Sequence, residues 1–437
     1  MISDTIAAIA TPPGIGGVGI LRLSGKDAHA IGAAVAGKVP AAGRFKYRRF
    51  RDAAGNEIDQ GLVLCFGAPA SFTGEDVVEL HGHGGPTPMA MLLTACIDAG
   101  AREAIPGEFS QRAFLNDRID LTQAEAIADL ISSATEQAAR SALRSIKGDF
   151  SEHIQNLEQE VINFRMYVEA AIDFPEEEID FLADEGVQKR LQKIKSQLQE
   201  TVESATAGEL LQQGVQIALV GEPNVGKSSL FNALVGSETA IVTDIPGTTR
   251  DVIAKSINLG GLLVHLLDTA GLCESEDTVE KIGIDRARRA LEEADLVLEL
   301  RDSTNKAAKN GPNIESALVV NTKADLSRGH QGASGGEILV SSKTTEGIPE
   351  LIQQIKNRVG FSNSTDNAFS ARKRHINLLD AALSAVVRGE TELNSAGAGE
   401  LLAEELRVAH DALGEITGKM TADDLLGEIF SGFCIGK

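Results

Sequence analysis

Cysteine is scarce in this sequence. Four cysteines occur in 437 residues, and their positions fit neither a metal site nor a disulfide framework. They predict reduced thiols in a cytosolic compartment. The four are Cys65, Cys96, Cys273 and Cys434.

Long apolar runs are also missing. No uninterrupted apolar stretch is long enough to span a bilayer. The first residues, Met1-Ile2-Ser3-Asp4, lack the basic start of a signal peptide. We therefore expect a soluble, cytoplasmic protein with no membrane partner.

Basic residues are fewer than acidic residues. The chain has 41 lysines and arginines against 63 acidic residues, a formal net charge of -22. A protein that binds nucleic acid mainly by neutralising phosphates would be basic. Any RNA contact must therefore be local, depend on geometry, or be shared with a partner. At this length, two or three domains are expected.

One sequence motif is the basis for interpreting the rest of the chain. The segment Gly221-Glu222-Pro223-Asn224-Val225-Gly226-Lys227-Ser228 fits G-x-x-x-x-G-K-[ST], the phosphate-binding loop. An apolar run of strand length, 215–220, precedes it, and 228–235 reads as a helix. A phosphate there would meet backbone N–H groups and the positive end of a helix dipole. Lys227 would reach the β- and γ-phosphates, and Ser228 would ligate Mg²⁺.

The flanks of this loop predict a multidomain protein of mixed α+β and α/β class. Residues 1–117 read as an N-terminal α+β domain, 118–213 as a first helical part, 214–360 as an inserted Ras-like α/β G domain, and 361–437 as a second helical part. Separate helical domains are the alternative.

The N-terminal domain is predicted from short apolar runs. Segments 5–11, 18–23 and 62–66 read as strands, and 87–99 as a helix. Two glycine-rich segments, 12–19 and 82–85, favour tight turns over close approach to a ligand or neighbouring chain. His81 and His83 are interpreted as loop histidines rather than metal ligands, because no third ligand lies nearby in sequence.

Helical periodicity marks the two flanking parts. Apolar stripes are expected at 121, 124, 128 and 131, at 187, 191, 194 and 198, at 378, 379, 382, 383 and 386, and at 401, 402, 406 and 413. The acidic run 175–180 is expected to form a solvated loop between two helices rather than a metal site.

Further elements of a guanine-nucleotide site follow the phosphate loop. Asp268 at a strand end suits water-mediated Mg²⁺ binding, and the Gly271 N–H suits γ-phosphate sensing. Thr249, in the switch segment between the two motifs, would complete the Mg²⁺ shell. The Asp325 carboxylate can accept from the guanine N1–H and amine, whereas Lys323 would pack along the base.

The predicted site departs from the usual pattern at two points. Thr322 stands where asparagine is usual, with Asn321 one position early, which predicts some loss of guanine contacts. Leu272 follows the Asp-x-x-Gly motif and cannot orient water, so Glu280 is the candidate, with Asp277 and Glu276 as rivals. From spacing alone, an exposed first-turn helix residue is the better interpretation of Glu280.

The complete set of predicted nucleotide-binding residues spans four segments. They are Asn224, Val225, Gly226, Lys227, Ser228 and Ser229; Thr243, Asp244, Ile245, Pro246, Gly247, Thr248 and Thr249; Asp268, Thr269, Ala270 and Gly271; and Thr322, Lys323, Asp325, Ser341, Ser342 and Lys343.

Over essentially its whole length the chain resembles the MnmE (TrmE) family of tRNA modification GTPases. The motifs that carry the resemblance are Asp4–Gly25, Ser71–Gly85, Pro106–Ser110, the switch Gly247-Thr248-Thr249-Arg250-Asp251 and the C-terminal Phe433-Cys434-Ile435-Gly436-Lys437.

This resemblance implies a homodimer formed through the N-terminal domains, each binding a 5-formyl- or methylene-tetrahydrofolate. The matching positions are Arg22, Glu79, Arg118 and Lys437; arginine at 118 stands where lysine is common, which keeps the charge but changes the hydrogen-bond geometry.

The resemblance also implies a K⁺ site and a protein partner, and the acidic balance of the chain fits a division of labour in which that partner supplies much of the RNA surface. Asn224, Thr243, Ile245 and Thr248 match the K⁺ site, and Glu280 matches the residue that orients water. A flavoprotein partner, MnmG (GidA), would act with the chain on carbon 5 of the wobble uridine in certain tRNAs. Cys434 is read either as a reactive thiol or as a small buried one.

We therefore predict a K⁺-dependent GTPase, using GTP and Mg²⁺, that is required for tRNA wobble-uridine modification. The alternative is a regulatory GTPase switch of the ribosome-assembly type, which should carry a basic RNA-binding domain. A third reading, a folate-binding scaffold with vestigial GTPase activity, is disfavoured by the intact Lys227, Ser228, Thr249 and Asp268.

Overall fold

The computed structural model describes residues 4–173, 185–236, 254–268, 291, 294–305, 317–326, 337–361, 368–419, 423–433 and 435–436. The chain divides into two compact units, residues 1–128 with 413–437 and residues 129–412. The predicted division into four segments is finer than these units and stays a prediction. Within the described ranges, no helix has the length and apolar character needed to cross a membrane.

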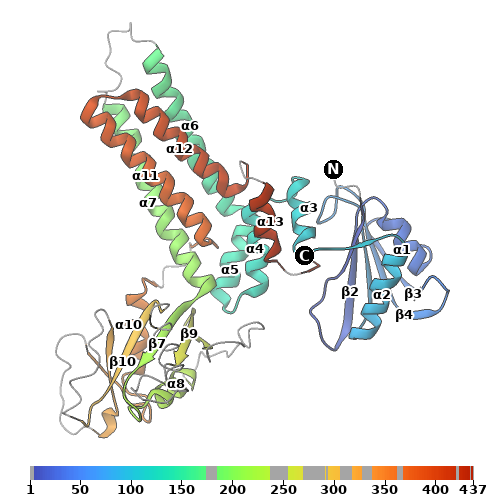
Figure 1. Cartoon of the computed structure of the whole chain (residues 1–437), viewed down its shortest axis with the longest axis horizontal. Helices are drawn as coiled ribbons and strands as arrows, with labels where there is room; N and C mark the ends of the chain where they lie inside the picture. The colour runs from blue at the N-terminus through green and yellow to red at the C-terminus, as the bar shows by residue number, and fades with distance from the viewer. Residues whose placement is uncertain are drawn as a thin grey trace, which may run out of the picture. The chain divides into compact units, whose positions relative to one another are not determined.

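The first unit contains a six-stranded sheet made of β1 (Ile6–Ile9), β2 (Gly16–Ser24), β3 (Arg44–Arg51), β4 (Glu57–Phe66), β5 (Val77–Gly84) and β6 (Arg102–Glu103). The strand order is β3-β4-β5-β2-β1-β6, antiparallel except for β1 beside β6. Helices α1 (Ala28–Ala36) and α2 (Pro86–Asp98) pack on one face (Figure 1). The predicted strands and helix are confirmed, with ends shifted by a few residues.

The turn interpretation of the two glycine-rich segments is correct for residues 12–15, which connect β1 to β2, and wrong for most of the remaining glycines. Gly16 and Gly19 lie in β2, and Gly82 and Gly84 lie in β5. The two strands pair through these residues, with a register shift between Gly16 and Gly19. A Cβ on Gly84 would lie 2.5 Å from the Val18 carbonyl oxygen. Glycine is therefore required by close approach of a neighbouring strand.

Three helices complete the first unit: α3 (Glu108–Leu115), the first part of α4 (Leu121–Ser132) and α13 (Asp423–Ser431). The rings of Phe114 and Phe430 lie 6.3 Å apart, and Leu121 is buried beside them. The C-terminal residues thus pack with the N-terminal ones. The predicted stripe on α4 is wrong at its end, because Ile131 is 44% exposed.

The helical part of the second unit comprises α5 (Glu136–Lys147), α6 (Asp149–Asp173), α7 (Glu185–Gln213), α11 (Lys373–Ala396) and most of α12 (Gly399–Thr417). In Figure 1, α6, α7, α11 and α12 form a long bundle. The predicted stripe at 187, 191, 194 and 198 is fully buried, as are Leu379 and Leu406 of the later stripes. Leu401 was wrongly included, because it is 48% exposed. The acidic run 175–180 lies outside the described residues.

A second six-stranded sheet carries the phosphate-loop motif. It is made of β7 (Val215–Val220), β8 (Ala254–Leu259), β9 (Leu262–Asp268), β10 (Leu296–Asp302), β11 (Leu318–Thr322) and β12 (Ile338–Leu339), with helices α8 (Lys227–Gly236) and α10 (Ile348–Arg358). The order is β12-β11-β10-β7-β9-β8, parallel except for β8. This confirms the α/β nucleotide fold. In such sheets, ligands bind at the carboxyl ends of the strands.

Candidate functional site

The phosphate loop connects the end of β7 to the start of α8. Val225 is buried at 4% exposure in the core beneath the sheet, which anchors the middle of the loop. Asn224 before it has φ of 62°, in the left-handed region that asparagine adopts more readily than most residues. Its side chain is exposed at the loop surface. The sequence therefore forms the predicted strand, turn and helix.

Lys227 is folded back over this loop. Its Nζ donates to the carbonyl oxygens of Gly221 at 2.6 Å and Glu222 at 3.2 Å. A phosphate placed in the loop would compete with these carbonyls for the ammonium group. Ser228 and Ser229 are exposed in the first turn of α8. Within the described part of the chain, the Ser228 hydroxyl has no hydrogen-bond partner, so it is available to a ligand.

Asp325, the predicted guanine-recognising residue, lies in a short 3-10 helix, Ala324–Leu326, just after β11. Its side chain is oriented by the second predicted base-contacting segment. Ser341 Oγ donates to Asp325 Oδ1 at 2.8 Å, while Thr344 N donates to Ser341 Oγ at 3.2 Å. The structure therefore brings Asp325 and Ser341 together. Ser342 and Lys343 follow in the same turn.

Lys323 adopts φ of +60°, and its Nζ donates to Asp302 Oδ2 at 2.6 Å. Burial alone would raise the pKa of Asp302, yet hydrogen bonds from Lys323 and Thr304 hold it below its ordinary value. Asp302 thus stays ionised and keeps the lysine at the end of β10. Packing of the Lys323 stem along a base remains a prediction.

Thr322 has a role that the sequence reasoning missed. Its hydroxyl is buried, at 2% exposure for the residue, and Oγ1 lies 2.5 Å from the Val225 carbonyl oxygen and 3.2 Å from that of Arg301. A hydroxyl has one proton, so the shorter contact is the hydrogen bond. It ties the end of β11 to the middle of the phosphate loop. Asn321 is held elsewhere, donating to Glu337 Oε2 at 2.9 Å, so it does not replace the missing asparagine.

Several predicted site residues lie outside the described part of the chain. Asp268 is described by its backbone alone: it ends β9 opposite Leu219 of β7, at the edge of the sheet where the phosphate loop begins. The residues outside are Thr243, Asp244, Ile245, Pro246, Gly247, Thr248, Thr249, Thr269, Ala270, Gly271, Glu276, Asp277, Glu280 and Lys437, with Cys273 and Cys434.

A second candidate site lies on the sheet of the first unit. Arg22 of β2 faces Glu79 of β5, and Arg22 Nε donates to Glu79 Oε1 at 2.9 Å. The Arg22 guanidinium lies 5.7 Å from the Phe109 ring centroid, and its Nη1 donates to the Gly436 carbonyl at 3.3 Å. The residue before Lys437 is thereby held beside Arg22 and Glu79.

His81 joins this group, which corrects its assignment to a loop. It lies in β5, and its Nε2 is 2.9 Å from Glu79 Oε2. Burial alone would raise the pKa of Glu79, but hydrogen bonds from His81 and Arg22, with their charges, hold it below its ordinary value. His83 is also in β5, and its Nδ1 is 2.7 Å from Asp59 Oδ1.

Arg118 is not brought into contact with Arg22 or Glu79 among the described residues; its exposed side chain lies beside Gly74.

Cys65 and Cys96 are buried free thiols, and burial raises the pKa of Cys96 to about 12. In the described ranges no three His, Cys, Asp or Glu residues form a group able to hold a metal ion.

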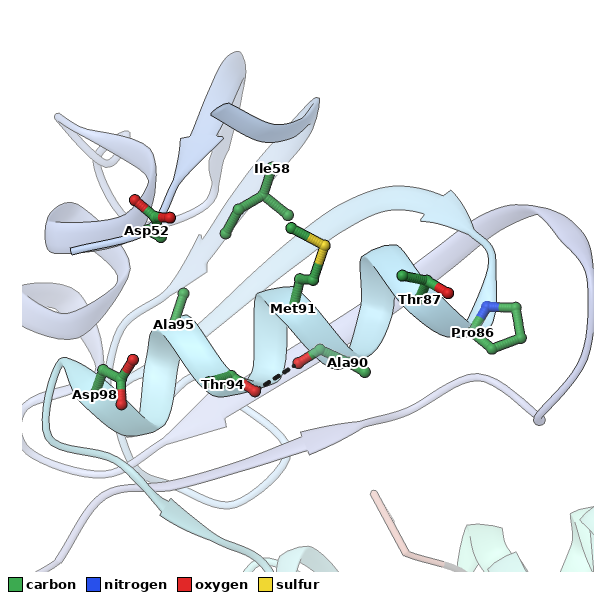
Figure 2. A pocket seen from close by; sticks show the side chains of 9 residues that line it. All are labelled: Asp52, Ile58, Pro86, Thr87, Ala90, Met91, Thr94, Ala95 and Asp98. Carbon is green, nitrogen blue, oxygen red and sulfur yellow. Dashed lines mark hydrogen bonds between the residues drawn. The ribbon is translucent and has the colours of Figure 1, made fainter. Parts of the chain in front are cut away.

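A cavity of about 580 Å³ separates α2 from the turn between β3 and β4 (Figure 2). Small and apolar side chains dominate its walls, with Asp52 and Asp98 as the two carboxylates. Thr94 turns inward on its own helix, donating to the Ala90 carbonyl at 2.9 Å. None of the predicted site residues lines it, and we assign it no ligand.

Comparisons with known proteins cover the whole chain. The family model "MnmE helical domain" matches residues 121–434, and "GTP-binding protein TrmE N-terminus" matches residues 5–118. Proteins named tRNA modification GTPase MnmE are similar over their full length. The one from Pseudomonas aeruginosa (strain UCBPP-PA14) is 50% identical, covering 100% of this chain and 99% of that protein. The one from Coxiella burnetii (strain RSA 493) is 49% identical, covering 99% of each.

Two solved structures are similar to part of the chain. The G domain of the T. maritima FeoB iron transporter is 29% identical and covers 33% of this chain and 98% of that one, with a TM-score of 0.25. Aquifex aeolicus Era is 23% identical and covers 39% of this chain and 66% of that one, also with a TM-score of 0.25.

Proposed function

This chain belongs to the MnmE family of tRNA modification GTPases, and on that premise we propose a K⁺-dependent GTPase cycle that drives C5 modification of the tRNA wobble uridine. The observation that carries the nucleotide part is the bond from Thr322 to the Val225 carbonyl. It joins the loop that would hold the phosphates to the strand whose end presents Asp325. One nucleotide can then contact both.

The proposed division of roles within the nucleotide site follows from the chemistry of each side chain. Lys227 binds the β- and γ-phosphates, and Asp325 selects guanine. Ser228 fits Mg²⁺ because its hydroxyl is exposed and unengaged in the described structure, and Thr249 would complete that shell. Mg²⁺ supplies charge neutralisation between the phosphates. Hydrolysis would use Glu280 to orient the attacking water.

K⁺ is proposed to bind beside the phosphates. Asn224 fits such a site because the left-handed turn leaves its amide, a neutral oxygen donor, exposed at the loop surface. Thr243, Ile245 and Thr248 would supply the remaining oxygen ligands. A monovalent cation there would offset transition-state charge, and its site would be completed when two nucleotide domains pair.

The second proposed ligand is a one-carbon tetrahydrofolate, bound by Arg22, Glu79 and Lys437. Glu79 suits it, since a carboxylate kept ionised can accept from the N–H groups of a 2-amino-4-oxopyrimidine ring. Arg118 is the weakest member of the proposed set, because its side chain lies beside Gly74. We further propose a homodimer formed through the N-terminal units, acting with the FAD-dependent MnmG on tRNA in the cytoplasm.

The experiment that tests this function is GTP hydrolysis by the purified chain in KCl and in NaCl at equal ionic strength. Strong activation by K⁺ alone is the expected result. Equal rates in the two salts would contradict the K⁺ mechanism while keeping the GTPase. They would favour the regulatory switch of the ribosome-assembly type.

A further inference from the structure

Residues 38–51 are strongly basic, whereas the chain as a whole is acidic. They contain six of its 41 basic residues and none of its 63 acidic residues. The remaining chain has 35 basic residues against 63 acidic ones, so a local concentration of this size stands out. We call this group the basic edge: Lys38, Arg44, Lys46, Arg48, Arg49 and Arg51.

The fold places most of the basic edge on an outer strand. β3 is the first strand in the sheet order, and among the described strands it pairs with β4 alone (Figure 1). Side chains alternate along a strand, which puts Arg44, Lys46 and Arg48 in one row, with alternate residues about 6.6 Å apart. Arg48 Nε donates to the Lys38 carbonyl at 3.0 Å, which holds the segment after α1 against this row.

The positive charge of this row is not neutralised within the described structure. On β4, Cys65, Val63 and Gly61 stand opposite Arg44, Lys46 and Arg48, and none is acidic. The basic edge has one ion pair there, Arg49 to Glu57 at 3.5 Å, and both partners are largely exposed. Exposed pairs of this kind contribute little. The exposed Arg44 and Lys46 are therefore available to an external anion, whereas Arg48 donates Nε and Nη1 to the Lys38 and Tyr47 carbonyls and adds its positive charge beside them.

Edge protection is the alternative explanation, since charged residues on outer strands prevent pairing with other sheets. It accounts for the charges but not for the side chains between them. Phe45 is 67% exposed and Tyr47 is 59% exposed, and exposed aromatics on an open edge would promote association. These two rings point to the opposite face of the sheet from Arg44, Lys46 and Arg48, so they do not share a surface with that row. Three cations on one face of an outer strand, with no acidic residue opposite them, are suited to the phosphates of an RNA backbone.

From this we propose that the basic edge binds the phosphate backbone of the tRNA substrate. The identity of the RNA rests on the proposed function, whereas the location of the binding surface rests on the charge and exposure of these residues. It resolves the conflict between a net charge of -22 and an RNA substrate, because the contact is confined to one strand. Electrostatic binding of this kind is largely independent of sequence and falls steeply with salt.

The test compares two variants that change the net charge equally. The first is Arg44→Gln, Lys46→Gln and Arg48→Gln together. The control is a triple glutamine variant of three surface arginines, each of which already has a carboxylate partner: Arg140, Arg388 and Arg407. Affinity for a labelled tRNA transcript is measured by fluorescence anisotropy at several KCl concentrations, beside GTP hydrolysis and molar mass by light scattering.

The edge variant should bind tRNA roughly 10- to 100-fold more weakly at low salt, with a salt slope shallower by about 2. The control should keep the wild-type affinity, and both should keep K⁺-activated hydrolysis and molar mass. Wild-type affinity and slope in the edge variant would overturn the proposal, as would an equal loss in the control. So would a wild-type chain without measurable tRNA affinity.

Two other outcomes would reassign the surface. Normal tRNA binding with a lower molar mass would make it an interface between copies of this chain. Normal tRNA binding with lost assembly with the flavoprotein would make it a protein-docking strand. The proposed GTPase is judged separately, because loss of K⁺ activation in the wild type would contradict that function without bearing on the basic edge.

Discussion

Replacing Thr322 by valine tests whether the phosphate loop is held from the end of β11. Valine keeps the shape of threonine but removes the hydroxyl. The site is buried, at 2% exposure, and the hydroxyl is 2.5 Å from the Val225 carbonyl, so few other donors can reach that oxygen. A buried acceptor left without its donor costs about 1–3 kcal/mol.

This penalty can be measured as a loss of nucleotide affinity or as a loss of folding stability. Where the loop relaxes in the free variant, nucleotide binding must restore its geometry, and affinity for GDP falls by about 5- to 150-fold. Where the loop cannot relax, the free energy of unfolding falls by the same 1–3 kcal/mol. Titration with a fluorescent GDP analogue and urea unfolding together capture both. Thr322→Ser, which keeps the hydroxyl, is the control.

Two results would refute the reasoning. One is a Thr322→Val protein with wild-type nucleotide affinity and wild-type unfolding free energy. The other is a Thr322→Ser protein as impaired as the valine variant, which would show that the methyl group, not the hydroxyl, matters. A partial loss shared between affinity and stability still supports the bond, because the two add to one penalty.

Four further predictions concern single residues. Asp325→Asn should weaken GTP binding by about 10- to 100-fold and improve XTP binding, because the amide donates to the carbonyl at position 2; competition titrations measure both. Glu280→Ala should abolish turnover with GTP affinity largely intact, and undiminished hydrolysis would remove Glu280 from the mechanism. Arg22→Ala should weaken tetrahydrofolate binding by calorimetry while GTPase activity is unchanged; equal folate affinity would contradict that site. Burial lowers the pKa of His153 below its ordinary value of 6.5, and this effect outweighs the opposing charge of Glu200. The neutral ring therefore stabilises the fold fully above pH 6.5, and this contribution falls as the pH decreases below that value. The melting temperature should fall less on acidification in His153→Gln than in the wild type.

Local patterns predicted much of the fold because the forces involved are local. The strand before the phosphate loop occupies Val215–Val220, as expected from its apolar run, and the stripe from Val187 to Leu198 is buried. The same reasoning failed at Ile131 and Leu401, which fit the spacing but are left largely exposed by the elements that the structure describes. Periodicity shows which face of a helix is apolar, but not how much of that face a neighbouring element covers.

Long-range polar contacts were not predictable from the sequence. Arg112 is 1% exposed, and its guanidinium donates to Asp4, Glu75 and Glu108, the first of which is 108 positions away. Burial lowers the pKa of Arg112, but these carboxylates outweigh it and raise that pKa. Sequence spacing signals only the Glu108–Arg112 pair, four residues apart on α3, and carries no signal for Asp4 and Glu75. The turn interpretation failed at Gly84 for the same reason, because glycine is needed there only where Val18 of another strand approaches.

Contacts of this long-range kind also hold the two connections of the second sheet. The chain enters through α7, which runs directly into β7 and the phosphate loop, and Gln212 of α7 donates to the Asp129 carbonyl at 2.7 Å. On its return, the chain is held by the Asp129 carboxylate, which accepts from Ser370 at 2.7 Å and Arg372 at 2.7 Å.

One buried residue of α4 therefore contacts both connections. A glycine near the C-terminal end of α7 allows the returning chain to lie against that helix, because a Cβ on Gly208 would lie 1.6 Å from the Phe369 carbonyl oxygen. The Asp129 contacts and the close approach at Gly208 therefore pack both connections of this sheet directly against α4 and α7. Because such contacts are close-packed, a change in volume at either residue is expected to disturb both connections.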